Sequence, residues 1–222
     1  MQTPLNTAAI DAVIVDLDGT ISDTLADFDA AIGGMLADLG LREPDPGFLL
    51  RKIGKGSEHL VRETLAHCGG TSGHYEAAWT AYQAHYAEVN GRHARVYDGV
   101  AEGLDHMRAR GWRLACVTNK PLRFAQALLA LHGLADHFEV VYGGDSFDRK
   151  KPDPLPLLEA CRALGSEPAR TLVVGDSSND AQAARAAGCP VVLVTYGYNH
   201  GEPIEAAGAD ALVDRIDAIG VL

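Results

Sequence analysis

Cysteine is scarce in this sequence, and its spacing argues against a disulfide framework. The four cysteines, Cys68, Cys116, Cys161 and Cys189, lie far apart and form no Cys-x-x-Cys pair. Three of them fall within apolar or helical runs, which favours buried free thiols over disulfides or zinc ligands. Because reduced thiols persist in a reducing compartment, we expect the protein to be cytoplasmic.

Basic residues are also in short supply, since 19 Lys and Arg stand against 30 Asp and Glu. The net charge of −11 argues against nucleic acid or an anionic membrane as the main partner. No apolar run approaches the length of a membrane span, and residues 1–4 do not begin a basic-then-apolar signal segment. An anionic substrate would therefore need a local pocket of positive charge.

What the chain does contain is a regular alternation of apolar runs and helical patterns. At 222 residues and 47% hydrophobic composition, it is long enough to bury a full core. The apolar runs lie at 13–15, 114–117, 140–142, 172–174 and 191–194. The helical patterns lie at 100–110, 124–131, 155–164 and 181–187. Strands that alternate with helices predict an α/β fold with a parallel sheet.

The stretch from about residue 24 to residue 95 breaks this alternation. It shows amphipathic helical patterns and no convincing strand, so we interpret it as a helical insertion after the first strand. The predicted division is a core of residues 1–22 and 96–222 and a helical cap of residues 23–95. The cap also contains an aromatic stripe, which we expect to pack in a hydrophobic core rather than bind a cofactor. It comprises Trp79, Tyr82 and Tyr86.

Carboxylates follow two of the predicted strands. Asp16 and Asp18 come directly after the first run, and Asp176 follows the run at 172–174, with Asp180 one helical turn later. Ligands of open α/β sheets gather at the carboxyl ends of strands, so these side chains are candidates for one site. Taken alone, an Asp-x-Asp-Gly sequence can equally be a turn in which the carboxylates bind backbone N–H groups.

Two further motifs follow strands or precede helices. Thr118 and Asn119 end the run at 114–117, where a hydroxyl, an amide and a helix N-terminus would form an anion site, although both residue types are also ordinary helix caps. Lys151 precedes Pro152, which holds the preceding residue extended. Its ammonium suits a phosphate oxygen or a carboxylate, the alternative being a solvated basic turn.

The oxygen-rich character of these motifs favours a hard cation. The predicted site contains carboxylates from two strands and no Cys, and none of the nine histidines follows a strand beside them. Magnesium therefore fits better than zinc. We expect the histidines to be structural or exposed to solvent.

In this order, the motifs resemble those of the haloacid dehalogenase superfamily. The four matching segments are DLDGT at 16–20, VTNK at 117–120, KKPDP at 150–154 and GDSSND at 175–180. The resemblance covers nearly the whole chain and implies a Rossmann-like core with an inserted α-helical cap. Three further segments are similar to bacterial phosphoglycolate phosphatases, namely IGKG at 53–56, GGDS at 143–146 and TYGYNHGEP at 195–203.

The resemblance also implies a role for each motif. Asp16 would be the nucleophile that forms an aspartyl-phosphate, and Asp18 the general acid and base. Phosphoryl oxygens would be held by Thr118, Asn119 and Lys151. Magnesium would be bound by Asp16, by the backbone carbonyl of Asp18 and by Asp176, with Asp180 in support through water or Lys151. A carboxylate approaches a phosphate dianion only when cations neutralise the encounter, so this assignment is physically coherent.

The leading hypothesis is a magnesium-dependent phosphatase for a small phosphorylated carboxylic acid, 2-phosphoglycolate. Alternatives are a phosphatase for another small ester such as a sugar phosphate, a phosphomutase, or a non-catalytic binding protein on the same fold. The cap loop Gly54, Lys55 and Gly56 is expected to set substrate specificity, with Lys55 as a partner for a substrate carboxylate. The sequence is compatible with a monomer or a homodimer.

Overall fold

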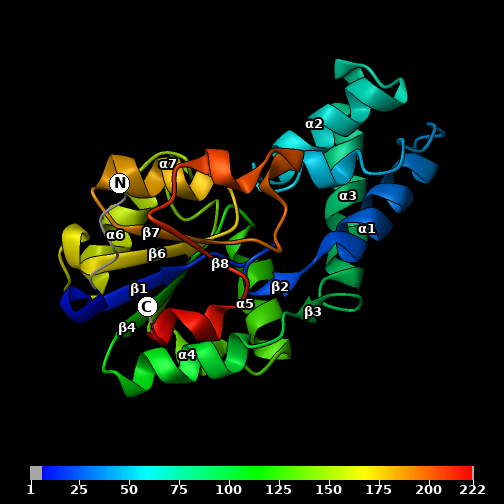
Figure 1. Cartoon of the computed structure of the whole chain (residues 1–222). Helices are drawn as coiled ribbons and strands as arrows, with labels where there is room; N and C mark the ends of the chain where they lie inside the picture. Colours follow the sequence, from blue (N-terminus) through cyan, green and yellow to red (C-terminus); the bar gives the residue numbers. More distant parts are fainter. Residues whose placement is uncertain (1–6, 222) are drawn as a thin grey trace.

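The computed structural model describes residues 7–221, with side chains as far as Ile219. Residues 1–6 and 222 lie outside this part, and with them the N-terminal segment considered above and the outer ends of the predicted core. Within the described residues, a parallel six-stranded sheet has the order β5-β4-β1-β6-β7-β8 (Figure 1). Its strands are β1 (Ala12–Val15), β4 (Arg113–Val117), β5 (Val140–Tyr142), β6 (Thr171–Gly175), β7 (Val191–Val194) and β8 (Ala211–Val213).

Helices cover both faces of this sheet, which explains why its strands are largely apolar. Alternate residues of β1 point to opposite faces: Val13 and Val15 pack beneath α4 (Val100–Ala109) and α5 (Leu122–Leu131). On the other face, Ile14 packs with α6 (Leu155–Ala163) and α7 (Ser178–Ala187). The predicted α/β class is therefore confirmed, and the helical layers lie above and below the sheet in Figure 1.

Three further helices lie to one side of the sheet and surround a hydrophobic cluster of their own (Figure 1). They are α1 (Leu25–Asp38), α2 (Ser57–Cys68) and α3 (Tyr75–Val89). The aromatic stripe of α3 lies in this cluster, where Tyr82 and Tyr86 are fully buried and their ring centroids are 5.4 Å apart. Phe124 and Tyr198 join the cluster from the main body, so the three helices also pack against the sheet domain.

Two short strands join the three-helix segment to the sheet domain. Strand β2 (Ser22–Asp23) pairs antiparallel with β3 (Arg95–Val96). These pairs lie at the positions where the sequence predicts the connections of a cap, and the division into 1–22 with 96–222 and 23–95 stays a prediction. Two-residue strands carry no period-2 pattern, so sequence analysis identified neither. It also missed β8, a three-residue edge strand.

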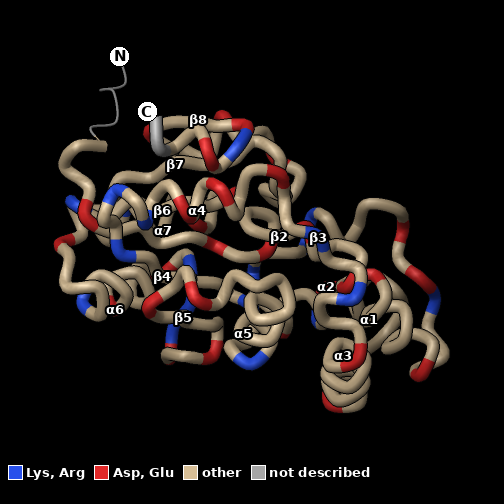
Figure 2. Tube along the Cα trace, turned by 90° about the horizontal axis from the view of Figure 1, so that it is seen from below, with Lys and Arg blue, Asp and Glu red and all other residues tan. Residues whose placement is uncertain are grey.

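The distribution of charge and of cysteine follows the composition. Lys and Arg are interspersed with Asp and Glu along the trace in Figure 2, with the acidic residues in excess. All four cysteines are free and buried, as predicted. Although widely spaced in sequence, Cys161 and Cys189 meet on the face of the sheet that α6 and α7 cover, with their Sγ atoms 4.0 Å apart. Among the described residues, no helix has the length and apolar character that crossing a bilayer requires.

Candidate active site

The predicted site residues lie at the carboxyl ends of three adjacent strands. Strand β1 pairs with β4 on one side and β6 on the other, so their ends meet at one edge of the sheet. Asp16 directly follows β1, Thr118 follows β4, and Asp176 follows β6. The backbone N–H of Asp16 donates to Val174 O at 2.9 Å, which continues the sheet pairing and fixes where this carboxylate begins.

Three carboxylates converge at this edge. Oxygen atoms of Asp16, Asp176 and Asp180 all lie within 4.8 Å of one another. Asp180 reaches the cluster from the first turn of α7, where its Oδ2 accepts hydrogen bonds from Ser177 N at 3.2 Å and Ser177 Oγ at 2.7 Å. This reciprocal capping arrangement holds the side chain in one orientation. Like charges this close and this buried repel one another, so a cation or a proton must offset them.

Lys151 supplies one positive charge to the cluster. Its Nζ lies 2.8 Å from Asp16 Oδ1 and 2.7 Å from Asp180 Oδ1, and it donates to Val117 O at 2.7 Å. Burial alone would lower the pKa of Lys151, but the two carboxylates raise it above its ordinary value, so the side chain stays charged. This contact to Asp180 agrees with the supporting role that the resemblance implied.

One ammonium does not neutralise three carboxylates. Burial, together with the nearby charge of Asp180, raises the pKa of Asp16 to about 7 against the opposing charge of Lys151. Burial and the same neighbour raise the pKa of Asp176 well above its usual range. An all-oxygen donor set with excess negative charge fits a hard divalent cation, for which Asp16, Asp176 and Asp180 offer ligand atoms.

The backbone around Asp176 is shaped to admit this carboxylate. A Cβ atom at Gly19 would lie 2.3 Å from Asp176 Oδ2, and one at Gly197 would lie 2.1 Å from Asp176 Cβ. The N–H of Tyr198 donates to Asp176 Oδ2 at 2.7 Å, which orients the group. Gly197 belongs to the 195–203 segment, so the loop that follows β7 packs directly against Asp176.

The raised pKa of Asp16 predicts how stability depends on pH when metal is absent. Between the unfolded pKa near 4 and the folded pKa of about 7, the folded protein binds more protons than the unfolded chain. The free energy of unfolding of the wild-type protein therefore falls as the pH rises through this window. We expect Asp16→Asn, which lacks this titration, to become more stable relative to wild type as the pH rises from 5 to 8.

Urea unfolding of both proteins in chelator, at several pH values, measures this difference. A stability difference that stays constant across the window, or shrinks as pH rises, would contradict the raised pKa.

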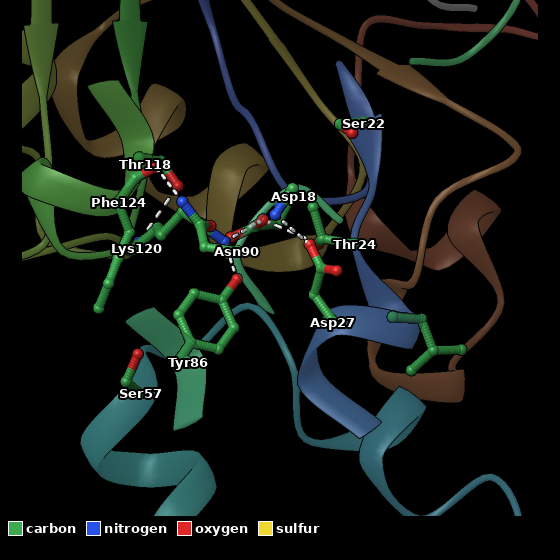
Figure 3. A network of polar contacts seen from close by, with 12 residues as sticks. Asp18, Ser22, Thr24, Asp27, Ser57, Tyr86, Asn90, Thr118, Lys120 and Phe124 are labelled. Atoms are coloured by element: carbon green, nitrogen blue, oxygen red, sulfur yellow. Dashed lines mark hydrogen bonds and ion pairs between the residues drawn. The ribbon is translucent and has the colours of Figure 1, made fainter. Parts of the chain in front are cut away.

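Asp18 points away from the acidic cluster. Its Oδ1 accepts hydrogen bonds from Thr24 Oγ1 at 2.8 Å and from Lys120 Nζ at 2.9 Å (Figure 3). Lys120 is almost completely buried and also donates to the hydroxyl of Tyr86. Its Nζ lies 4.8 Å from the ring centroids of both Phe28 and Tyr86. The two aspartates of the first motif therefore occupy different environments, which suits them to different roles.

Sequence analysis quoted Lys120 within the second motif but gave it no role. The role of binding an anion was assigned to the neighbouring Asn119 instead. A lysine in a loop is ordinarily solvated, and only the packing of α1 and α3 over this residue shows that it is buried. The signal available in the sequence was its place three residues after the end of a predicted strand.

Asn119 connects the loops around the site. Its Nδ2 donates to Gly54 O at 2.9 Å and to Lys151 O at 2.8 Å, while its buried Oδ1 has no hydrogen-bond partner. Asn179 Nδ2 also donates to Gly54 O, at 3.1 Å. The cap loop is thus held onto the sheet domain by two amides, of which sequence analysis identified one.

Thr118 Oγ1 accepts a hydrogen bond from the backbone N–H of Lys120 at 3.2 Å.

The cap loop closes the site from above. Gly54 and Gly56 line a pocket with Asp16, Asp18 and Thr118, whereas Lys55 is exposed and is absent from its lining. The pocket leaves about 20 Å³ for the centres of water-sized molecules, enough for one water.

The chain matches the model of the haloacid dehalogenase-like hydrolase family over residues 13–194. It belongs to this family. The match spans all four motifs and more than three quarters of the sequence, which confirms the predicted resemblance.

Individual relatives cover almost the whole hydrolase. The phosphoglycolate phosphatase of Thiobacillus denitrificans is 44% identical over 93% of this chain and 92% of its own. The plasmid-encoded phosphoglycolate phosphatase of Cupriavidus necator is 46% identical over 95% of this chain and 92% of its own.

Solved structures share the fold of this hydrolase. The crystal structure of a predicted phosphoglycolate phosphatase from Haemophilus somnus superimposes with a TM-score of 0.89 at 33% identity, covering 95% of this chain and 96% of that one. CbbY from Rhodobacter sphaeroides in complex with phosphate has a TM-score of 0.81 at 26% identity, with coverage of 95% and 96%. The six-stranded core with its three-helix addition is therefore that of the family.

Proposed function

We propose that this hydrolase of phosphoric monoesters is a magnesium-dependent phosphatase that converts 2-phosphoglycolate to glycolate and phosphate. The observation that carries the proposal is the separation of two buried aspartates: Asp16 beside Lys151 in a cation-demanding cluster, and Asp18 two residues away outside it. The relatives named phosphoglycolate phosphatase, at 44% and 46% identity over nearly the full length, support this substrate.

In the first half of the reaction, Asp16 attacks phosphorus. A bond forms between its carboxylate oxygen and phosphorus while the bond from phosphorus to the glycolate oxygen breaks. Asp18, in its protonated form, gives its proton to the departing oxygen. Thr118, Asn119 and Lys151 hold the phosphoryl oxygens, and Lys151 already lies within ion-pair distance of the nucleophile.

In the second half, water hydrolyses the aspartyl-phosphate on Asp16. Asp18 takes a proton from the water as its oxygen bonds to phosphorus, and the bond from phosphorus to the Asp16 oxygen breaks. Phosphate leaves, and both carboxyl groups return to their starting states. Because Asp18 lies outside the acidic cluster, it can change protonation without losing a cluster contact.

Magnesium, when bound, would offset the charge repulsion between the Asp16 carboxylate and the phosphate dianion. We assign it to Asp16, Asp176 and the backbone carbonyl of Asp18, with Asp180 in support. The donor set consists of oxygen atoms and carries more negative charge than Lys151 neutralises, which fits this ion. The protein is proposed to act in the cytoplasm, as a monomer or homodimer.

Phosphate release from a panel of small esters tests the proposal. With magnesium, we expect 2-phosphoglycolate to give the highest kcat/KM, at least about tenfold above sugar phosphates, since one charged contact is worth about that much. Excess chelator should abolish activity. Calcium should inhibit, because its longer bonds and higher coordination number let it bind both Asp16 oxygens and occupy the nucleophile.

Each alternative function has its own result in this panel. A sugar phosphate as the best substrate would replace 2-phosphoglycolate, and an isomeric phosphate without phosphate release would indicate a mutase. Full activity in chelator would overturn the cation assignment. If the folded protein turns over none of the esters, the hypothesis of a non-catalytic binding protein would be favoured.

A further inference from the structure

Lys120 is a buried cation that faces both the proposed acid and the substrate pocket. Within residues 7–221, it is the one cationic residue that lines the pocket holding Asp16 and Asp18. Its side chain is 1% exposed, so water does little to screen its charge. Resting on the proposed function, we infer that Lys120 binds the carboxylate of the substrate.

The ammonium has a hydrogen-bond donor to spare. A lysine carries three N–H donors, and Lys120 directs two of them to Asp18 Oδ1 and the Tyr86 hydroxyl. Figure 3 shows Lys120 between Thr118 and Tyr86 with its nitrogen in the polar network that includes Asp18. The third donor can serve an anionic group in the pocket that these residues line.

The surroundings of Lys120 favour an anion over a neutral group. The aromatic rings of Phe28 and Tyr86 exclude water on one side, which strengthens any charged contact made there. The pocket is also lined by Gly56 and Ser57, where helix α2 begins. The first-turn N–H groups of a helix have no partner within the helix, so they add positive potential to that wall.

Sequence analysis assigned this contact to Lys55. In the structure, Lys55 is exposed on the cap loop and absent from the pocket lining, whereas Lys120 is buried within it. Water screens a contact to an exposed ammonium strongly, so it discriminates poorly between charged and neutral substrates. Lys120 therefore meets the requirement for recognition better than the residue that the loop motif indicated.

A pair of matched substrates tests this inference. Ethyl phosphate has a methyl group where 2-phosphoglycolate has its carboxylate, and the two are otherwise alike around phosphorus. For Lys120→Met, we expect kcat/KM to fall at least about tenfold on 2-phosphoglycolate, the loss of one charge-assisted hydrogen bond. On ethyl phosphate we expect a clearly smaller loss, because this ester has no carboxylate for Lys120 to bind.

Control variants separate recognition from other effects. Lys52→Met removes a positive charge from the cap loop at a residue that pairs with Glu63 outside the pocket, and it should leave the substrate ratio unchanged. Lys55→Met tests the rival residue. If Lys120→Met fails to fold by circular dichroism, Lys120→Gln keeps a donor for Asp18 without the charge and should show the same selective loss.

The outcomes are distinct. Equal losses on both substrates would make Lys120 a positioning residue for Asp18 alone and overturn the inference, while the proposed function would stand. A selective loss in Lys55→Met, with none in Lys120→Met, would overturn it in favour of Lys55. A wild-type enzyme that does not turn over 2-phosphoglycolate at all would remove the proposed function and this inference together.

Discussion

Asp16→Asn should abolish turnover while leaving the fold intact. An amide has nearly the shape of a carboxylate, but it is a poor nucleophile and a poor magnesium ligand. We expect kcat to fall on the order of 10⁴-fold or more, as for other nucleophile removals. Steady-state phosphate release, with circular dichroism as the test of folding, measures the effect.

A matched substitution lies at the other end of the same strand. Asp11 precedes β1, is exposed and pairs with Arg170 on the surface. Asp11→Asn should retain activity and change the stability little, because water screens an exposed ion pair. Activity near wild type in purified Asp16→Asn would remove the nucleophile from the proposed mechanism, and equal losses in both variants would indicate a general effect on the strand.

Asp18→Asn should reduce turnover by roughly 10²–10⁴-fold, the usual contribution of acid–base catalysis. Metal binding should survive, because the Asp18 side chain points to Thr24 and Lys120 rather than into the acidic cluster. The loss should be far smaller for aryl phosphates, whose leaving groups depart without a proton. Comparing 2-phosphoglycolate with 4-nitrophenyl phosphate measures this dependence on the leaving group.

Aryl phosphates also separate the two steps in which Asp18 is proposed to act. Hydrolysis of the aspartyl-phosphate is common to all substrates, so a loss restricted to alkyl esters locates the main role of Asp18 in the first step. Identical losses on alkyl and aryl esters would contradict the role of general acid. Loss of magnesium-dependent thermal stabilisation in this variant would instead make the side chain a metal ligand.

The sequence by itself determined the class of the fold and the residues at the strand ends. Parallel strands buried on both faces are largely apolar, so five of the six were visible as apolar runs. A polar residue directly after such a run must lie at the edge of the sheet. For this reason Asp16, Thr118 and Asp176 could be assigned to one edge before their spatial order was known.

Only the tertiary structure decided which side chains meet. The order β4-β1-β6 places strands from three separate parts of the chain side by side, and no local pattern encodes it. The pairing of Lys151 with both Asp16 and Asp180 depends on that order. So does the proximity of Cys161 and Cys189, which nothing in their spacing indicated.

The cap interface shows the same division most clearly. The helical patterns of residues 24–95 predicted apolar faces but not what those faces would cover. The structure places Phe28 and Tyr86 against Lys120, a residue whose position in a loop would by itself predict a solvated side chain. Burial is a property of the packed molecule, since it depends on segments distant in sequence, and burial gives this ammonium an unscreened charge.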